Sequence, residues 1–156
     1  MAADLDKIDL KILRLLQENG RITNLLLSQE IGLSPAPTLE RVRKLEQSGY
    51  IKSYHALVDE EKLGLGIKTF IQVQLDFHKN NTIQTFLDEV NQIKEITECH
   101  HVTGQADFLL KVYVHDIKAY ERLIMEKISK ISVVKTFQTM MIMSTTKKEP
   151  IIPLEY

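Results

Sequence analysis

The strongest constraint on the fold is a helix whose two ends are both marked in the sequence, at Ser34 and Gly49. Ser34 suits the N-cap and Pro35 the first helical position, while glycine readily adopts the left-handed conformation in which helices end. Between these ends an apolar residue recurs every third position, which predicts one stripe that faces a core: Leu39, Val42 and Leu45. The other side chains of this helix are therefore predicted to face outward.

A second helix precedes it at the spacing of a helix-turn-helix. Thr23 provides an N-cap and Gly32 an end, and Leu33 alone separates this glycine from Ser34. Three apolar residues predict the buried face of this helix: Leu26, Leu27 and Ile31. A short connection that contains glycine is typical of the motif in which the second helix enters the major groove of DNA.

Further elements on both sides complete a small domain. Upstream, four apolar residues at helical spacing lie between a start at Asp4 or Asp6 and the Asn19-Gly20 corner: Ile8, Ile12, Leu15 and Leu16. Downstream, YIKSYHALVD is interpreted as a hairpin strand, or wing, with three residues on one face: Ile51, His55 and Leu57. Residues 1–59 are therefore predicted to form a winged helix-turn-helix DNA-binding domain. An ordinary helical hairpin with a basic outer face is the alternative.

Composition limits the classes of protein to which the chain can belong. Its 156 residues, 44% of them hydrophobic, provide for one ordinary domain or two small ones. No apolar stretch approaches the roughly 20 residues needed to cross a bilayer, and the acidic start lacks the order of a secretory signal. We therefore expect a cytoplasmic protein with no membrane partner. The single cysteine, Cys99, excludes an internal disulfide and a multi-cysteine zinc site.

The positive charge of the chain is local rather than general. The net charge is -1, and nine Lys and Arg oppose ten Asp and Glu before Gly66. Because DNA affinity depends on neutralised phosphates, one subunit alone is expected to bind weakly. The cations that can act together lie on the predicted recognition helix and wing: Arg41, Arg43, Lys44 and Lys52. We therefore expect DNA binding to require several paired subunits.

The sequence pattern changes after a linker placed at residues 60–66. Residues 67–156 follow the order strand, helix, strand, strand, helix, strand, which is that of a ferredoxin-like domain with both helices on one sheet face. The predicted fold class is therefore α+β. The other sheet face needs a cover, and the final strand is rich in Met, so we expect a second copy of the chain to pack there. The last residues, EPIIPLEY, are interpreted as a tail that packs against a neighbour or stays loose.

Cys99, His100 and His101 are the residues that most suggest a metal or a catalytic group. Alternation along a strand puts Cys99 and His101 on one face and His100 on the other, whereas zinc requires three or four converging ligands. Packing is the favoured role for Cys99. No glycine-rich phosphate loop, nucleophile elbow or helical His pair occurs in the sequence. We therefore expect no enzymatic activity, no metal and no cofactor.

Two runs of sequence carry a resemblance to a known family: LSPAPTLERVRKLEQSGYIKSYHALV and ECHHVTGQADFLLKVYVHDIKAYERL. The chain resembles the leucine-responsive regulator and asparagine regulator (Lrp/AsnC) family of bacterial and archaeal transcription factors over nearly its whole length. The resemblance implies an N-terminal domain that binds double-stranded DNA and a C-terminal domain that responds to amino acids. It also implies homodimers that assemble further, with an octamer expected, and DNA that bends around the assembly.

The family's effector loop corresponds here to VTGQADF, and a plain hairpin turn is the alternative interpretation of it. Gly104 can bring backbone N–H groups close to a carboxylate, and Asp107 can pair with an ammonium group. Gln105 and Ala106 stand where relatives often have an acidic and a bulky residue, so a leucine preference is not transferred. The expected pocket is soft and suits a medium-sized aliphatic or thioether side chain. The expected effector-binding residues are His101, Thr103, Gly104, Gln105, Ala106, Asp107, Gln138 and Met140.

Arg41 is the strongest candidate for contact with a base edge. It lies nearer the helix N-terminus than Arg43, and an arginine can bond guanine O6 and N7 for roughly 1 to 3 kcal/mol of discrimination. A surface ion pair with an acid is the alternative for Arg41, and a phosphate or an intramolecular partner for Arg43. The remaining DNA-binding candidates are Ser34, Pro35, Thr38, Glu40, Lys44 and Lys52, chiefly through phosphates. A role as helix cap alone is the alternative for Ser34.

These expectations combine in one leading function and two alternatives. The leading function is a sequence-specific transcription regulator whose oligomeric state and DNA occupancy respond to an amino acid. The first alternative is an architectural protein that bends DNA without an effector. The second is a ligand-binding domain that regulates a partner enzyme, and salt-dependent DNA binding would count against it.

Overall fold

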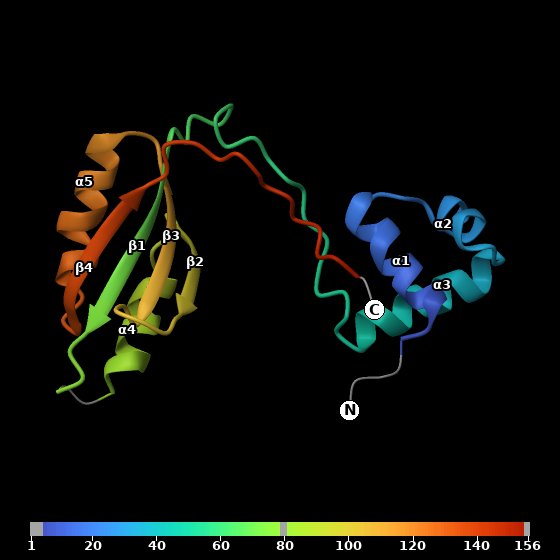
Figure 1. Ribbon diagram of the computed structural model, residues 1–156, viewed down its shortest axis with the longest axis horizontal. Coiled ribbons are helices and arrows are strands. Elements are labelled where there is room, and N and C mark those ends of the chain that lie inside the picture. The colour runs from blue at the N-terminus through green and yellow to red at the C-terminus, as the bar shows by residue number, and fades with distance from the viewer. Residues whose placement is uncertain (1–4, 79–80, 155–156) are drawn as a thin grey trace. The chain divides into compact units, whose positions relative to one another are not determined.

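The computed structural model describes residues 5–78 and 81–154 and divides the chain into two compact units (Figure 1). The helical unit contains Met1–Leu57 together with Lys147–Tyr156. The second unit contains Val58–Thr146 and is called the sensing unit after the role that the resemblance implies. The sequence pattern assigns the C-terminal tail to the second domain, whereas the structure groups it with the helices. Asp4, one of the two predicted helix starts, and the last two residues of the tail lie outside the described residues.

Three helices form the helical unit: α1 (Lys7–Glu18), α2 (Asn24–Ile31) and α3 (Pro35–Gln47). Asp6 caps α1 in a capping box with Asp9, and Thr23 caps α2 by accepting from a backbone N–H. Gly32 adopts a φ of 76° at the end of α2, where a side chain would strain the backbone. The predicted helices and the tight turn between α2 and α3 are confirmed.

A small core holds these helices together. Its buried apolar side chains are Ile12, Leu27, Ile31 and Leu45. Leu26 and Leu39 were predicted to join this core, but they are 52% and 40% exposed. Thr38 takes the place predicted for Leu39, because the helix is rotated by about one residue, or 100°, relative to the predicted stripe. This rotation brings Arg41 to the edge of the inner face.

The wing predicted after α3 is not formed as a strand. Residues 51–58 have no strand pairing, and Leu57 and Val58 are exposed. A strand requires a neighbour, and the described part of the helical unit contains no strand. The segment is joined to α3 instead by Tyr54, whose hydroxyl donates to Glu46 Oε1 over 3.0 Å. Burial, together with Glu46, raises the pKa of Tyr54 to about 12.

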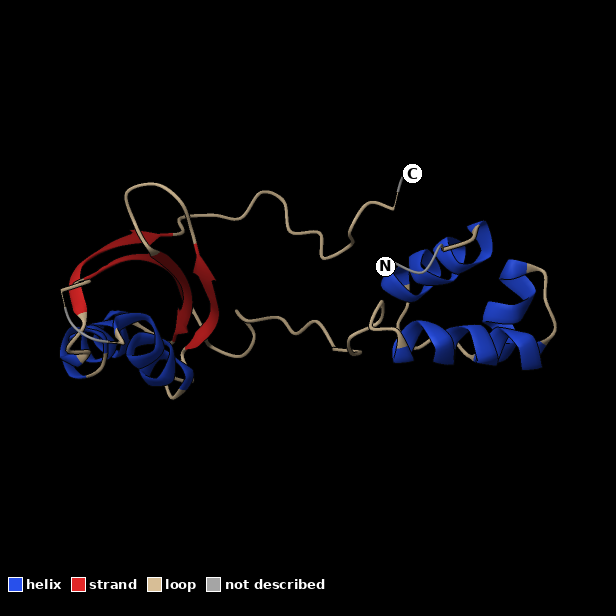
Figure 2. Ribbon diagram, turned by 90° about the horizontal axis from the view of Figure 1, so that it is seen from below, coloured by secondary structure: helices blue, strands red, loops and turns tan. Residues whose placement is uncertain are grey.

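The sensing unit is a four-stranded antiparallel sheet with α-helices on one face (Figure 2). Its elements are β1 (Ile67–Leu75), α4 (Thr82–Asn91), β2 (Ile96–His101), β3 (Phe108–Val114), α5 (Ile117–Glu126), the 3-10 helix η1 (Ile128–Lys130) and β4 (Val134–Met141). The strand order β2-β3-β1-β4 confirms the ferredoxin-like prediction. No helix in the described ranges is long and apolar enough to span a bilayer.

Alternation along the strands separates a covered face from an open face. On the covered face, Phe86 of α4 is fully buried and its ring centroid lies 4.8 Å from that of Phe108. The sheet residues that share this core include Ile71, Val73, Leu110 and Val112. The open face carries side chains that are not fully buried, including Phe70, Gln72, Leu109, Tyr113, Gln138 and Met140.

Candidate DNA-binding and effector-binding sites

The outer face of α3 carries polar and charged side chains. At about 100° per residue, the positions opposite the inner face are Glu40, Arg43, Lys44 and Gln47, and all four are exposed. Among the residues that the structure describes, neither Arg43 nor Lys44 makes an ion pair. Lys52, which follows α3 in the sequence, is also exposed and makes no ion pair with a described residue. These cations are therefore available to DNA phosphates.

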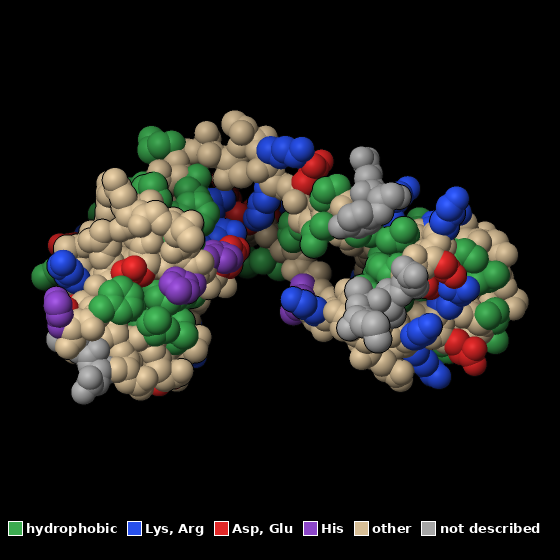
Figure 3. Space-filling view, turned by 60° about the horizontal axis from the view of Figure 1, so that its bottom comes forward, with side chains coloured by type: hydrophobic (Ala, Val, Ile, Leu, Met, Phe, Trp, Pro, Cys, Tyr) green, Lys and Arg blue, Asp and Glu red, His purple; other side chains and the backbone are tan. Residues whose placement is uncertain are grey.

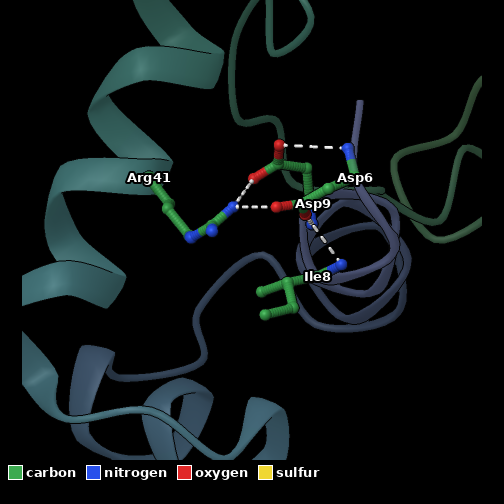
Figure 4. Close-up of polar contacts among 4 residues, drawn as sticks. All are labelled: Asp6, Ile8, Asp9 and Arg41. Carbon is green, nitrogen blue, oxygen red and sulfur yellow. Dashed lines mark hydrogen bonds and ion pairs between the residues drawn. The ribbon is translucent and has the colours of Figure 1, made fainter. Parts of the chain in front are cut away.

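Arg41 points from α3 toward the start of α1 (Figure 4). Its Nη1 donates to Asp6 Oδ2 and to Asp9 Oδ1, each over 2.7 Å. The Asp9 side chain is 15% exposed, so this pair is partly shielded from water. Hydrogen bonding from the Asp9 backbone N–H, and then from Arg41, lowers the pKa of Asp6. The structure thus shows the ion pair that the sequence left as an alternative, and base contact by Arg41 stays a prediction.

Replacing Arg41 with alanine, or Asp9 with asparagine, is expected to destabilise the helical unit, because each change breaks the ion pair between these two residues. The arginine change also breaks the pair with Asp6. A double-mutant cycle of denaturant unfolding is expected to give a coupling of about 1 kcal/mol. The contribution of Asp6 is present above its unfolded pKa of about 3.9 and is lost as pH falls through its lower folded pKa. Arg14→Ala, which changes an exposed arginine of α1, is the control. Simple addition of the two effects would contradict the pairing.

The structure corrects one predicted phosphate contact at the start of α3. Thr38 is 0% exposed and its Oγ1 donates to the Ser34 carbonyl over 2.9 Å, so it cannot reach DNA without unpacking. Ser34 occupies the N-cap position, but its side chain makes no capping hydrogen bond. Pro35 is the first helical residue and is exposed. The Ser34 hydroxyl therefore remains available to a phosphate.

Cations and acids are mixed on the surface of the helical unit. Figure 3 shows Lys and Arg side chains beside Asp and Glu side chains on the visible face of this unit. The mixture agrees with the nearly balanced charge of the chain. Attraction to DNA must therefore come from a few well-placed cations rather than from a uniform positive field.

The predicted effector loop, residues 102–107, connects β2 and β3. Gly104 has a φ of 119°, which residues with a Cβ rarely adopt. Apart from the glycine and its two chain neighbours, no described residue has an atom within 4 Å of the place where a Cβ would stand. A small anionic group can therefore approach the backbone here. Ala106, in contrast, is 8% exposed, so its methyl group packs inside the molecule.

Asp107 joins this loop to the end of β1. Its Oδ2 accepts from the Leu75 N–H over 2.8 Å, and its own N–H donates to the Val73 carbonyl over 2.9 Å. Its Oδ1 has no hydrogen-bond partner among the described residues. One carboxylate oxygen is thus structural, and the other is free to accept from a ligand's ammonium group.

Two family models match the chain. Residues 5–52 match a winged helix-turn-helix DNA-binding model, and residues 68–152, more than half of the chain, match the Lrp/AsnC ligand binding domain. The chain belongs to the Lrp/AsnC family of transcription regulators. Its helical unit is thus the DNA-binding domain of an Lrp/AsnC regulator, and its sensing unit is the ligand-binding domain.

Relatives of this Lrp/AsnC regulator align over almost the whole chain. The leucine-responsive regulatory proteins of Escherichia coli (strain K12) and Klebsiella pneumoniae are 40% identical over 93% of this chain and 88% of their own. A transcriptional regulator of Neisseria meningitidis, solved as a complex with L-Met, has a TM-score of 0.93 and 34% identity over 97% of both chains. AsnC of E. coli has a TM-score of 0.88 and 26% identity over 97% of this chain and 100% of that one.

The effector residues expected in this Lrp/AsnC chain do not all converge. His101 lies on the covered face, where its ring stacks on Phe108 with centroids 4.8 Å apart. Gln138 and Met140 lie on the open face. Opposite faces of one sheet cannot line one pocket within a chain. Residues 103–107 therefore form the part of the predicted site that a single chain assembles.

Sequence reasoning missed one residue of this region, Gln74 of β1. Its Nε2 donates to the Gln105 carbonyl, and its Oε1 accepts from the Thr136 hydroxyl over 2.7 Å. Gln74 thus links the effector loop to both β1 and β4 at the bulge between Gln74 and Leu75. The one available signal was the alternation of Gln72 and Gln74 with apolar residues in the second half of the strand.

The residues that suggested a metal have other partners in this Lrp/AsnC regulator. Within the described ranges, no group of three or more His, Cys, Asp and Glu side chains is placed to hold a metal ion. Cys99 and His101 share the covered face and His100 lies on the other, as strand alternation predicts. Burial raises the pKa of the Cys99 thiol, which favours packing over nucleophilic chemistry. His100 Nε2 lies 3.0 Å from Glu98 Oε2.

Proposed function

We propose that this regulator binds specific DNA as a homo-oligomer, and that an amino acid bound at loop 102–107 alters its DNA occupancy. The observation that carries the proposal is the open backbone at Gly104 in the same loop as the free Oδ1 of Asp107. These groups complement the carboxylate and the ammonium that every free amino acid carries. A ligand that favours one oligomer changes how many α3 helices meet DNA together, which couples the two sites.

The proposed effector has a medium-sized aliphatic or thioether side chain. Support comes from the Neisseria meningitidis regulator, which was solved with L-Met. Ala106 is buried and does not line an open space, so in this chain the support is Met140, which offers a soft apolar surface on the open face. Met140 pairs with Phe70, four residues along β1 from Gln74, which contacts the loop, so the proposal assigns to a neighbouring subunit the residue that reaches the ligand side chain.

The proposed assembly is a dimer formed through the open sheet faces, which associates further into an octamer. Phe70, Leu109, Tyr113 and Met140 give this face an apolar centre that is only partly buried in one chain. Partly buried apolar side chains on an open sheet face are commonly covered by a second subunit. Assembly also multiplies the few cations of each helical unit, which offsets their small number.

At DNA, we assign phosphate contacts to Arg43, Lys44, Lys52 and the Ser34 hydroxyl. Glu40 shares the outer face of α3, and its carboxylate can accept from cytosine N4 in the major groove. Arg41 is assigned to positioning α3 on α1 through its ion pairs. A regulator of this kind acts on the chromosome rather than as an enzyme, and we place it in the cytoplasm.

Calorimetric titration with each of the twenty amino acids, one at a time, tests the effector site. Heat is expected with one or a few amino acids for the wild-type protein and none for Gly104→Trp. A bulky residue at a φ of 119° strains the loop and fills the open space beside it. Thermal unfolding and low-salt DNA binding serve as controls that the variant is folded.

Three outcomes would oppose the proposed function in different ways. Equal heats for the wild-type protein and Gly104→Trp would remove the site from this loop. Absence of heat with every amino acid, with DNA binding retained, would favour the architectural alternative. Absence of salt-dependent DNA binding would favour regulation of a partner protein.

A further inference from the structure

The C-terminal tail contacts α1 through its backbone. Gln17, in the last turn of α1, accepts from the Ile152 N–H through Oε1 over 2.7 Å. The same side chain donates from Nε2 to the Ile152 carbonyl over 3.2 Å. Both backbone groups of one tail residue are therefore paired with one side-chain amide, as they would be with a neighbouring strand.

The composition of the tail suits this mode of docking. Pro150 and Pro153 flank the contact, and proline restricts the backbone and donates no hydrogen bond. A restricted segment loses less conformational entropy when it docks, which favours the bound form. Leu154 is partly buried although it lies close to the chain end. The tail therefore has the properties of a docking segment rather than of a loose end.

The tail is a covalent connection between the sheet of the sensing unit and the helices of the DNA-binding domain. The tail follows β4, the strand that carries Gln138 and Met140, after a short connection of residues 142–146. It docks on α1, the helix whose capping box holds Arg41 of α3. The covalent path from the sensing sheet thus reaches the helix that supports the recognition helix. This path is additional to the linker that enters the sensing unit after Leu57.

We infer that residues 150–154 dock on the Gln17 face of α1 in their own chain, and that this docking transmits the effector signal from β4 to the DNA-binding helices. The transmission part rests on the proposed function, whereas the docking part does not. An effector that shifts β4 or its end changes the tension or the register of the tail, and so changes the fraction of docked tail. Coupling of this kind requires that the docked and free states differ in DNA affinity.

The inference is tested in the full-length protein with two variants that remove the contact in different ways. Gln17→Ala removes the side-chain amide, and a stop codon after Glu149 removes the docking segment. Gln29→Ala, which changes an exposed glutamine of α2, is the matched control. L-methionine is the probe, and the measured quantity is the ratio of DNA dissociation constants with and without it.

Both contact variants are expected to bind L-methionine and, without it, DNA within about two-fold of wild type. Their DNA affinity ratio is expected to fall toward one, from about five-fold or more in the wild-type protein and in Gln29→Ala. An unchanged ratio in both contact variants would overturn the transmission. If sedimentation changed in the truncated chain but not in Gln17→Ala, the tail would be assigned to subunit contacts. That result would also overturn the inference.

Amide hydrogen exchange of Ile152 tests the docking without any effector. Exchange is expected to be faster in Gln17→Ala than in wild type and unchanged in Gln29→Ala. Equal exchange rates in all three proteins would exclude docking in solution. Faster exchange in Gln17→Ala, without any response of the wild-type protein to L-methionine or another amino acid, would refute the proposed effector and leave the docking established.

Discussion

Replacing Arg43 and Lys44 together with alanine is expected to weaken binding to every DNA duplex and to reduce its salt dependence. Both side chains are exposed on the outer face of α3 and have no ion-pair partner among the described residues, so their removal leaves the fold intact. Each lost phosphate contact lowers the slope of log Kobs against log salt by about 0.9. A dimer that loses two contacts per subunit is therefore expected to lose about 3 to 4 units of slope.

The measurement is a salt titration of binding to a selected operator and to scrambled DNA. Lys118→Ala with Arg122→Ala is the matched control, because it removes the same charge from exposed positions of α5. The control is expected to keep the wild-type slope. A similar fall in slope for both double variants would show that general charge, rather than the face of α3, attracts the DNA.

Replacing Phe86 with alanine is expected to lower the free energy of unfolding of the sensing unit by about 3 to 5 kcal/mol. Phe86 is fully buried, and its ring packs against Phe108 in the core between α4 and the sheet. The helical unit has a separate core around Ile12, which is also fully buried. The effect of Phe86→Ala is therefore expected to remain within one unit.

Hydrogen exchange resolved by segment measures this independence. Phe86→Ala is expected to speed exchange in β1 and β3 and to leave α1 and α2 unchanged. Ile12→Ala is the reciprocal variant, with an expected loss of about 2 to 5 kcal/mol confined to the helices. Equal loss of protection in both units, for either variant, would show one cooperative structure instead of two cores.

The predictable parts of the fold are those decided by neighbours in the sequence. Asp6, Thr23 and Gly32 mark helix ends by local hydrogen bonds and backbone conformation, which any helix with these residues shares. The strand order followed from the alternation of strands and helices. The prediction of a strand at the wing was wrong because a strand also needs a neighbouring strand that is distant in the sequence. Residues 51–58 pair with no strand among the described residues of the chain.

In the candidate sites, too, contacts between neighbours in the sequence were predictable and contacts between distant residues were not. The loop around Gly104 was predictable because glycine and an acid lie close together in the sequence. The ion pair of Arg41 joins residues 32 and 35 positions apart, and the bond of Gln74 to Thr136 joins residues 62 positions apart. Such partners depend on how elements pack, which periodicity does not reveal. The separation of His101 from Met140 likewise depends on strand register.

The discontinuity of the helical unit has a consequence for exchanging domains between regulators. The sensing unit lies between two segments of the helical unit, so it occupies the position of an insertion. A chimera with one junction after Leu57 would join the DNA-binding helices of one regulator to the terminal segment of another. A faithful exchange needs two junctions, one after Leu57 and one after Thr146, so that Gln17 and Ile152 come from the same parent.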